Sequence, residues 1–135
     1  MQKPELPAQA RSVTGKKTMA LRRQGITPIH VYGKEIQPLS LQANTRELLA
    51  VLARAGRTTP VTVTVNGEQH FTFVREVQRA PASGALLHAD FQQVPMTELM
   101  RAEVPIRSIG EAPAVRLHNG VMTHYLHLLE VECLP

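Results

Sequence analysis

The residues best suited to recognising a polar ligand lie between positions 78 and 90. His88 and Asp90 are two residues apart in an expected strand, so their side chains face the same way. Gln78 and Arg79 precede a loop that contains Pro81, and both carry donors suited to base edges or phosphates. A carboxylate among them could accept from the amino group of guanine or cytosine, or orient the imidazole. The alternative is that His88 and Asp90 are ordinary polar residues on the wet face of a sheet.

Basic residues are concentrated near the N-terminus. Residues 1–34 hold seven lysines and arginines against one glutamate, a local charge of +6, whereas residues 35–135 carry −2. Such asymmetry is typical of a segment that faces a polyanion, although a solvated basic tail remains the alternative. Tyr32 follows in an expected strand, where it could stack on or hydrogen-bond to a nucleotide. The candidate phosphate-binding cations are Arg11, Lys16, Lys17, Arg22 and Arg23.

Signals for catalysis, metal binding or membrane insertion are weak. The sequence has no Gly-rich phosphate loop, nucleophile elbow or HExxH motif, and its single Cys133 excludes a disulfide framework. His118, His124 and His127 are the nearest approach to a metal set, but on a strand the last two would face opposite sides. No apolar run approaches the ~18–20 residues of a membrane span, and the N-terminus lacks the apolar core of a signal peptide. We therefore expect a cytoplasmic protein that is not an enzyme and has no cofactor, metal site or small-molecule substrate.

Short strands and two helices must position these residues. Strands are expected over residues 6–13, 29–32, 37–41 and 86–93, a two-stranded hairpin over residues 61–77, and helices over residues 16–24 and 45–55. Asn44 is a suitable N-cap for the second helix, and Gly25 and Gly56 are suitable stops. The strands follow one another through hairpins without βαβ alternation. This pattern predicts a mainly β fold, a six-stranded antiparallel, partly open barrel with two helices.

Two local features refine this expectation. Pro7 has no N–H, so the first strand is expected at a sheet edge. The hairpin around Asn66 and Gly67 could have a two-residue or a three-residue loop. The three-residue loop pairs Thr64 with Glu68 and brings the valines of residues 61–65 and both phenylalanines, 71 and 73, to one side, so we favour it. That preference weakens if both faces of the hairpin are buried.

The C-terminal part begins after a linker, Val94-Pro95-Met96. Strands are expected over residues 101–109 and 121–133, around a loop from Gly110 to Gly120. Two strands are marginal as an independent unit. We therefore divide the chain into an RNA-binding β-barrel domain, residues 1–93, and a β-rich extension, residues 94–135.

The chain resembles the bacterial large-subunit ribosomal protein L-twenty-five family, also called general stress protein Ctc. The resemblance covers essentially the whole chain. Its blocks follow in the family's order and spacing: Gly15-Lys16-Lys17, Leu21-Arg22-Arg23-Gln24-Gly25-Ile26-Thr27-Pro28, Val31-Tyr32-Gly33, Val77-Gln78-Arg79-Ala80-Pro81, Leu87-His88-Ala89-Asp90-Phe91 and Leu129-Glu130-Val131-Glu132-Cys133-Leu134-Pro135.

This resemblance implies a six-stranded barrel that binds 5S ribosomal RNA within the large ribosomal subunit, beside neighbouring ribosomal proteins. It places Arg11, Lys16, Arg22, Tyr32, Gln78, Arg79, His88 and Asp90 at the RNA. Lys17-Thr18-Met19-Ala20 departs from the family's usual Gly-Ala-Ser-Arg-Arg run, which puts contacts from that turn in doubt. Ala80 replaces the usual histidine before proline. The chain also ends where longer members continue, so the extension is expected to be the start of the family's second domain, in a natural short form or a trimmed one.

The sequence thus predicts a non-catalytic, ribosome-associated RNA-binding protein. The N-terminal turn and helix would hold phosphates, and the strand ends would recognise groove edges of an irregular RNA helix. One alternative is a β-rich adaptor that binds proteins and carries a solvated basic tail. Another is a small metal-dependent hydrolase that uses the three C-terminal histidines.

Overall fold

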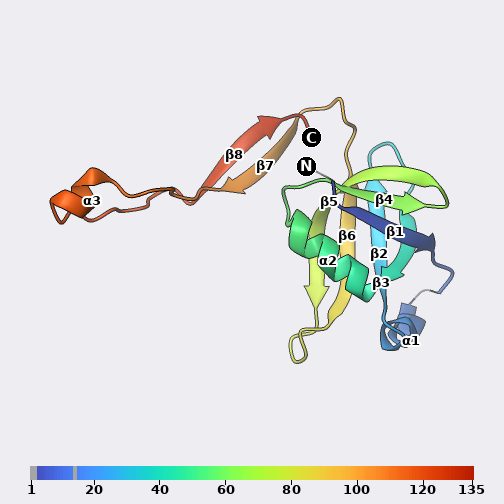
Figure 1. Cartoon of the computed structure of the whole chain (residues 1–135). Coiled ribbons are helices and arrows are strands. Elements are labelled where there is room, and N and C mark those ends of the chain that lie inside the picture. The colour runs from blue at the N-terminus through green and yellow to red at the C-terminus, as the bar shows by residue number, and fades with distance from the viewer. Residues whose placement is uncertain (1–2, 14) are drawn as a thin grey trace. The chain divides into compact units, whose positions relative to one another are not determined.

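The computed structural model describes residues 3–13 and 15–135 (Figure 1). Contacts among these residues divide the chain into two compact units, one ending at Glu98 and the other spanning Leu99–Leu134. Within the described ranges, no helix has both the length and the apolar character needed to cross a membrane.

Six strands of the described part of the first unit form a barrel. Their order around it is β1 (Glu5–Ala10), β3 (Leu39–Asn44), β2 (Ile26–Gly33), β6 (Leu86–Gln93), β5 (Glu68–Arg79) and β4 (Val61–Val65) (Figure 1). The predicted mainly β, six-stranded barrel is confirmed. Two details need correction: the barrel is closed rather than partly open, and β1–β4 and β2–β6 are parallel pairs. Strands of these pairs are far apart in sequence, and a hairpin pattern indicates only the pairing of neighbours.

Alternation along the strands fills the barrel interior with aliphatic side chains. The buried members include Leu6, Ala8, Ile29, Val31, Leu41, Ala43, Val61, Val63, Ala89 and Phe91. Helix α2 (Thr45–Ala55) packs its buried Leu48, Val51 and Ala55 against this cluster. Asn44 caps the helix, since its side-chain oxygen accepts a hydrogen bond from the Arg46 amide at 3.0 Å. The residues facing away from this core are therefore the ones that a ligand can reach.

Strand β1 is not at a sheet edge as expected, because the barrel closes through it. It pairs with β4 through residues 5–8 and with β3 only through Gln9 and Ala10. The Thr62 amide donates to the Pro4 carbonyl. The backbone polar groups of alternate residues 4, 6 and 8 therefore point toward β4. The nitrogen of Pro7 then faces the stretch that the β3 ladder does not reach. The missing N–H is accommodated by this local gap in pairing.

The β4–β5 hairpin has the two-residue loop, so the preferred three-residue loop is wrong. Val65 pairs with Glu68, and Asn66 and Gly67 both have positive φ, 50° and 87°. This combination matches the twist that a two-residue hairpin needs. The resulting register places Thr72 inside the barrel opposite Val61, where its hydroxyl donates to the Val61 carbonyl at 3.0 Å. The hydrogen-bonded Thr72 thus lies opposite Val61, where the three-residue loop would have placed a phenylalanine. Phe71 and Phe73 are only partly buried.

The predicted N-terminal helix over residues 16–24 is present as two pieces. A 3₁₀ turn, η1 (Gly15–Lys17), leads into α1 (Thr18–Arg23). The Thr18 hydroxyl donates to the Gly15 carbonyl at 2.8 Å, which joins the two pieces. Gly25 has a φ of 76° and ends the helix, as its sequence position indicates. The chain then enters β2, against which α1 packs.

The second unit contains an antiparallel strand pair. β7 (Met100–Pro105) pairs with β8 (Leu128–Cys133), so the strands expected over residues 101–109 and 121–133 are shorter than predicted. The connection also contains a short helix, α3 (Pro113–Leu117), where a loop was expected. Pro113 at its first turn is suited to start a helix, because its fixed φ is helical and its missing N–H would be unpaired there.

Candidate functional site

A row of polar residues crosses three strands on the outside of the barrel and ends just beyond a fourth. Asp90 of β6 is paired with His30 of β2, which is paired with Ser40 of β3. The Arg11 amide, just beyond β1, donates to the Ser40 carbonyl at 3.0 Å. We call these four residues the polar row. The row faces outward because the adjacent residues in the three strands are buried in the core: Ala89, Ile29 and Leu41.

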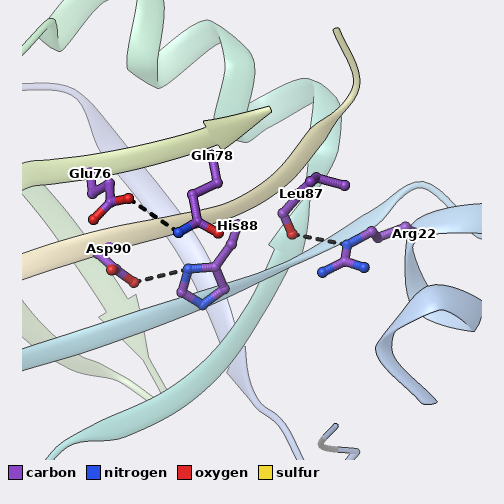
Figure 2. A network of polar contacts seen from close by, with 6 residues as sticks. All are labelled: Arg22, Glu76, Gln78, Leu87, His88 and Asp90. Carbon is purple, nitrogen blue, oxygen red and sulfur yellow. Dashed lines mark hydrogen bonds and ion pairs between the residues drawn. The ribbon is translucent and has the colours of Figure 1, made fainter. Parts of the chain in front are cut away.

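His88 and Asp90 approach each other at one end of this row. The His88 Nδ1 atom lies 2.9 Å from Asp90 Oδ1, and the side chains are 25% and 24% exposed (Figure 2). The predicted shared face is therefore confirmed by a direct contact. The carboxylate orients the imidazole while both groups remain within reach of a ligand.

Two buried polar atoms of the polar row have no hydrogen-bond partner among residues 3–13 and 15–135. They are Nε of Arg11 and Oδ1 of Asp90, whose short approach to His88 is not aligned as a hydrogen bond. An unpaired buried polar atom costs about 1–3 kcal/mol. Such atoms are uncommon unless a ligand, ion or water completes them. A donor and an acceptor on the same face are thus left unpaired by the described residues.

The environment of His88 keeps its ring neutral. Burial lowers its pKa below the ordinary value of 6.5; Asp90 opposes this shift, and Arg11, His30 and Arg22 reinforce it. The neutral ring has one N–H and one nitrogen lone pair, so His88 can offer a ligand a donor or an acceptor.

The opposite side of β6 extends the polar surface onto β5. Gln78 is paired with His88, and its Nε2 donates to Glu76 Oε1 at 3.1 Å (Figure 2). Glu76 in turn is paired with Asp90. Arg79 is turned toward the following loop, where its guanidinium donates to the Gly84 carbonyl at 3.4 Å. Gln78 therefore joins the surface as predicted, whereas Arg79 lies at its margin.

Helix α1 brings one of the predicted cations to the same place. Arg22 is partly buried, and its Nε donates to the Leu87 carbonyl at 2.9 Å, next to His88 (Figure 2). This bond spans 65 residues of sequence and holds α1 against β6. Within residues 3–13 and 15–135, this is the hydrogen bond that the Arg22 guanidinium makes. The other cations of this segment are exposed: Lys16, Lys17 and Arg23.

Tyr32 lies on the same outer face of β2 as His30. The two rings are 6.0 Å apart between centroids and are tilted by 48°. Tyr32 is paired with Gln92 of β6, two residues beyond the His30–Asp90 pair and on the same face. An aromatic surface is thus continuous with the polar row.

The structure groups the predicted residues unevenly. It brings together Arg11, Arg22, Tyr32, Gln78, His88 and Asp90, while Lys16, Lys17, Arg23 and Arg79 lie toward the solvent. His30, Ser40 and Glu76 belong to the same surface and were missed. The spacing of His30 two residues before Tyr32 was a usable signal, because alternate residues of a strand share a face. Ser40 could be found only from the pairing of β2 with β3.

Comparison with known proteins identifies the family. A model of the Ribosomal L25p family matches residues 6–91, well over half of the chain and nearly the whole barrel. The chain belongs to the Ribosomal L25p family. The matched range contains every residue of the polar row and all of the predicted RNA-contacting residues.

Two relatives extend the likeness beyond the barrel. The large ribosomal subunit protein bL25 of Roseiflexus castenholzii is 38% identical over 135 residues, which cover 99% of this chain and 62% of the relative. The protein of the same name from Geobacillus kaustophilus is 40% identical over 131 residues, covering 96% of this chain and 62% of the relative. The chain thus spans about three-fifths of the length of these L25p relatives, whose names are those of ribosomal proteins and not of enzymes.

The C-terminal histidines of this L25p chain do not form a metal site with one another. His124 and His127 meet edge to face, with ring centroids 4.7 Å apart, in an irregular segment before β8. His118 follows α3 and is exposed. Among residues 3–13 and 15–135, no three potential ligands converge closely enough to hold a metal ion. The hydrolase alternative has no support in this geometry.

Proposed function

We propose that this chain is a structural protein of the large ribosomal subunit that binds 5S ribosomal RNA through the outer face of its barrel. The names of its relatives support the large subunit and its neighbouring ribosomal proteins as the setting, and hence a cytoplasmic, ribosome-associated location. We assign RNA binding to residues 1–93 and leave residues 94–135 as a β-rich extension.

One observation carries the RNA proposal: cations and unpaired polar atoms converge on one surface. The Arg22 bond to Leu87 places a guanidinium beside His88, and Arg11 lies at the other end of the polar row. Between them lie the unpaired Asp90 oxygen and the neutral imidazole of His88. A purely solvated basic tail would have no reason to be fixed to this surface.

The residues divide into two roles. Five cations supply positive charge to phosphates, which provides affinity without selecting a sequence: Arg11, Lys16, Lys17, Arg22 and Arg23. Asp90 repels phosphates but accepts from base amino groups, so it selects where a base edge is exposed. Irregular RNA helices expose such edges, whereas regular A-form helices hide them in a deep, narrow major groove.

The second role extends to Gln78 and Tyr32. Gln78 offers an amide close to His88, and Tyr32 offers an aromatic ring for stacking. Arg79 contributes charge from the loop at the margin of the surface. The combination suits an internal loop of a folded RNA better than a uniform duplex.

The test is a titration of the full chain with isolated 5S ribosomal RNA, with a structured RNA of similar length as the control. If five cations each neutralise a phosphate, log K falls against log salt with a slope of roughly −3.5 to −4.5. Preference for the 5S RNA over the control supports the proposal. Equal binding to both RNAs, or a slope near zero, would overturn it.

Sedimentation separates this proposal from a protein-binding adaptor. The chain should sediment with 50S particles at low salt and leave them at high salt, because phosphate contacts are displaced by counterions. Retention at high salt together with loss of 5S binding would favour the adaptor.

A further inference from the structure

We infer that His30, which lies outside the predicted RNA-contacting set, is itself an RNA contact that stacks on an unpaired base. The inference rests on the proposed function and names a further residue of the same surface. His30 is partly buried on the outer face of β2, between Ser40 on one side and Asp90 on the other.

The first argument is that its ring has no function within the barrel. Neither ring nitrogen of His30 has a hydrogen-bond or ion-pair partner among the described residues, unlike His88 and His70. The ring does not belong to the core cluster, since Ile29 and Val31 provide the inward side chains of this strand. A polar aromatic ring in this position is therefore available to a ligand.

The second argument is its position within the polar row. Neighbouring strands lie about 4.8 Å apart, so the row from Arg11 to Asp90 spans three strand spacings, about 14 Å. His30 lies near the middle of that span, with an unpaired donor at one end and an unpaired acceptor at the other. A base over His30 can place its edge toward Asp90 while its phosphate lies toward Arg11.

The third argument is the neighbouring aromatic ring. Tyr32 lies 6.0 Å away with its plane tilted by 48°, so the two rings do not stack on each other. Each ring keeps a face for a base, and histidine and tyrosine both serve as stacking partners for splayed bases in RNA complexes. The pair therefore offers two adjacent stacking positions along β2.

The experiment compares three variants of the full chain in the 5S RNA titration. His30→Ala should weaken binding at least about fivefold, the lower end of what one base-stacking contact contributes. His30→Phe keeps a flat ring and should stay within about twofold of the wild type. His70→Ala is the matched control, since it removes an imidazole that lies outside the polar row and bonds Gln93, and it should leave affinity unchanged.

Thermal unfolding of each variant checks that the barrel is intact. In the wild-type protein, the ring proton signals of His30 should move upfield when 5S RNA is added, as expected beneath a stacked base. Wild-type affinity in His30→Ala, equal weakening by the phenylalanine variant, or unmoved His30 signals would each overturn the inference. Failure of the wild type to prefer 5S RNA would instead refute the proposed function.

Discussion

Replacement of Asp90 by Asn tests whether this carboxylate selects the RNA. The change keeps the side-chain shape but removes one negative charge from the end of the polar row. It also removes the group that raises the pKa of His88, so His88 stays neutral while losing its charged partner. Binding of any RNA through phosphates alone should therefore not suffer from the substitution.

Two opposing effects set the expected magnitude. Removal of a unit charge about 7 Å from a phosphate relieves ~0.6 kcal/mol of repulsion in water, and salt reduces this further. Loss of the carboxylate acceptor for a base amino group costs about 1–3 kcal/mol in discrimination. The second effect is larger, so affinity for 5S RNA should fall about tenfold while affinity for the control RNA stays level or rises slightly.

The assay is fluorescence anisotropy with both RNAs at one fixed salt concentration. Glu68→Gln is the control, because it removes the same charge from an exposed position at the start of β5, outside the polar row. This variant should keep the preference for 5S RNA. If Asp90→Asn lowers the affinity for both RNAs equally, the selective role of this carboxylate is refuted.

Three further outcomes follow from the same geometry. Because the folded protein holds the pKa of His88 below 6.5, the unfolded chain takes up the proton first as pH falls. The free energy of unfolding in urea should therefore decrease from pH 7.5 to pH 6 more in the wild type than in His88→Gln; identical decreases would contradict the shift. Arg22→Gln should make the salt slope less steep by about 0.7–0.9, whereas Arg54→Gln on the exposed side of α2 should not change it; equal slopes for both variants would contradict the placement of Arg22. Gly33→Ala should destabilise the barrel by about 1–3 kcal/mol, because the new Cβ would lie 2.9 Å from the Gln93 carbonyl oxygen; an unchanged melting temperature would show that β2 and β6 can separate there.

Local structure was predictable where neighbouring residues decide it. The helix over residues 45–55 and the strand over residues 86–93 have the predicted bounds, because caps, glycines and alternation are encoded within a few positions. The register of the β4–β5 hairpin was not predictable in this way, because Asn66 and Gly67 suit a tight turn while the positions of the phenylalanines favoured the longer loop. The interior of a closed barrel decided it by accommodating Thr72 with its hydroxyl bonded.

The candidate site shows the same division. Alternation alone placed His88 and Asp90 on one face, and the 2.9 Å contact follows from that spacing. Arg11, His30 and Ser40 lie on the same face as this pair only because β2 pairs with β3 and β6. One of those pairings is parallel and joins strands about sixty residues apart, which no local pattern indicates.

By itself, the sequence determined the charge asymmetry, the mainly β character and the types of side chain that are suited to binding a polyanion. These properties depend on composition and on periods of a few residues. The tertiary structure alone decided which cation is fixed beside His88, which polar atoms are left unpaired, and that His30 lies between Ser40 and Asp90. Those outcomes depend on which strands become neighbours when the barrel closes, and closure is set by the packing of the whole core.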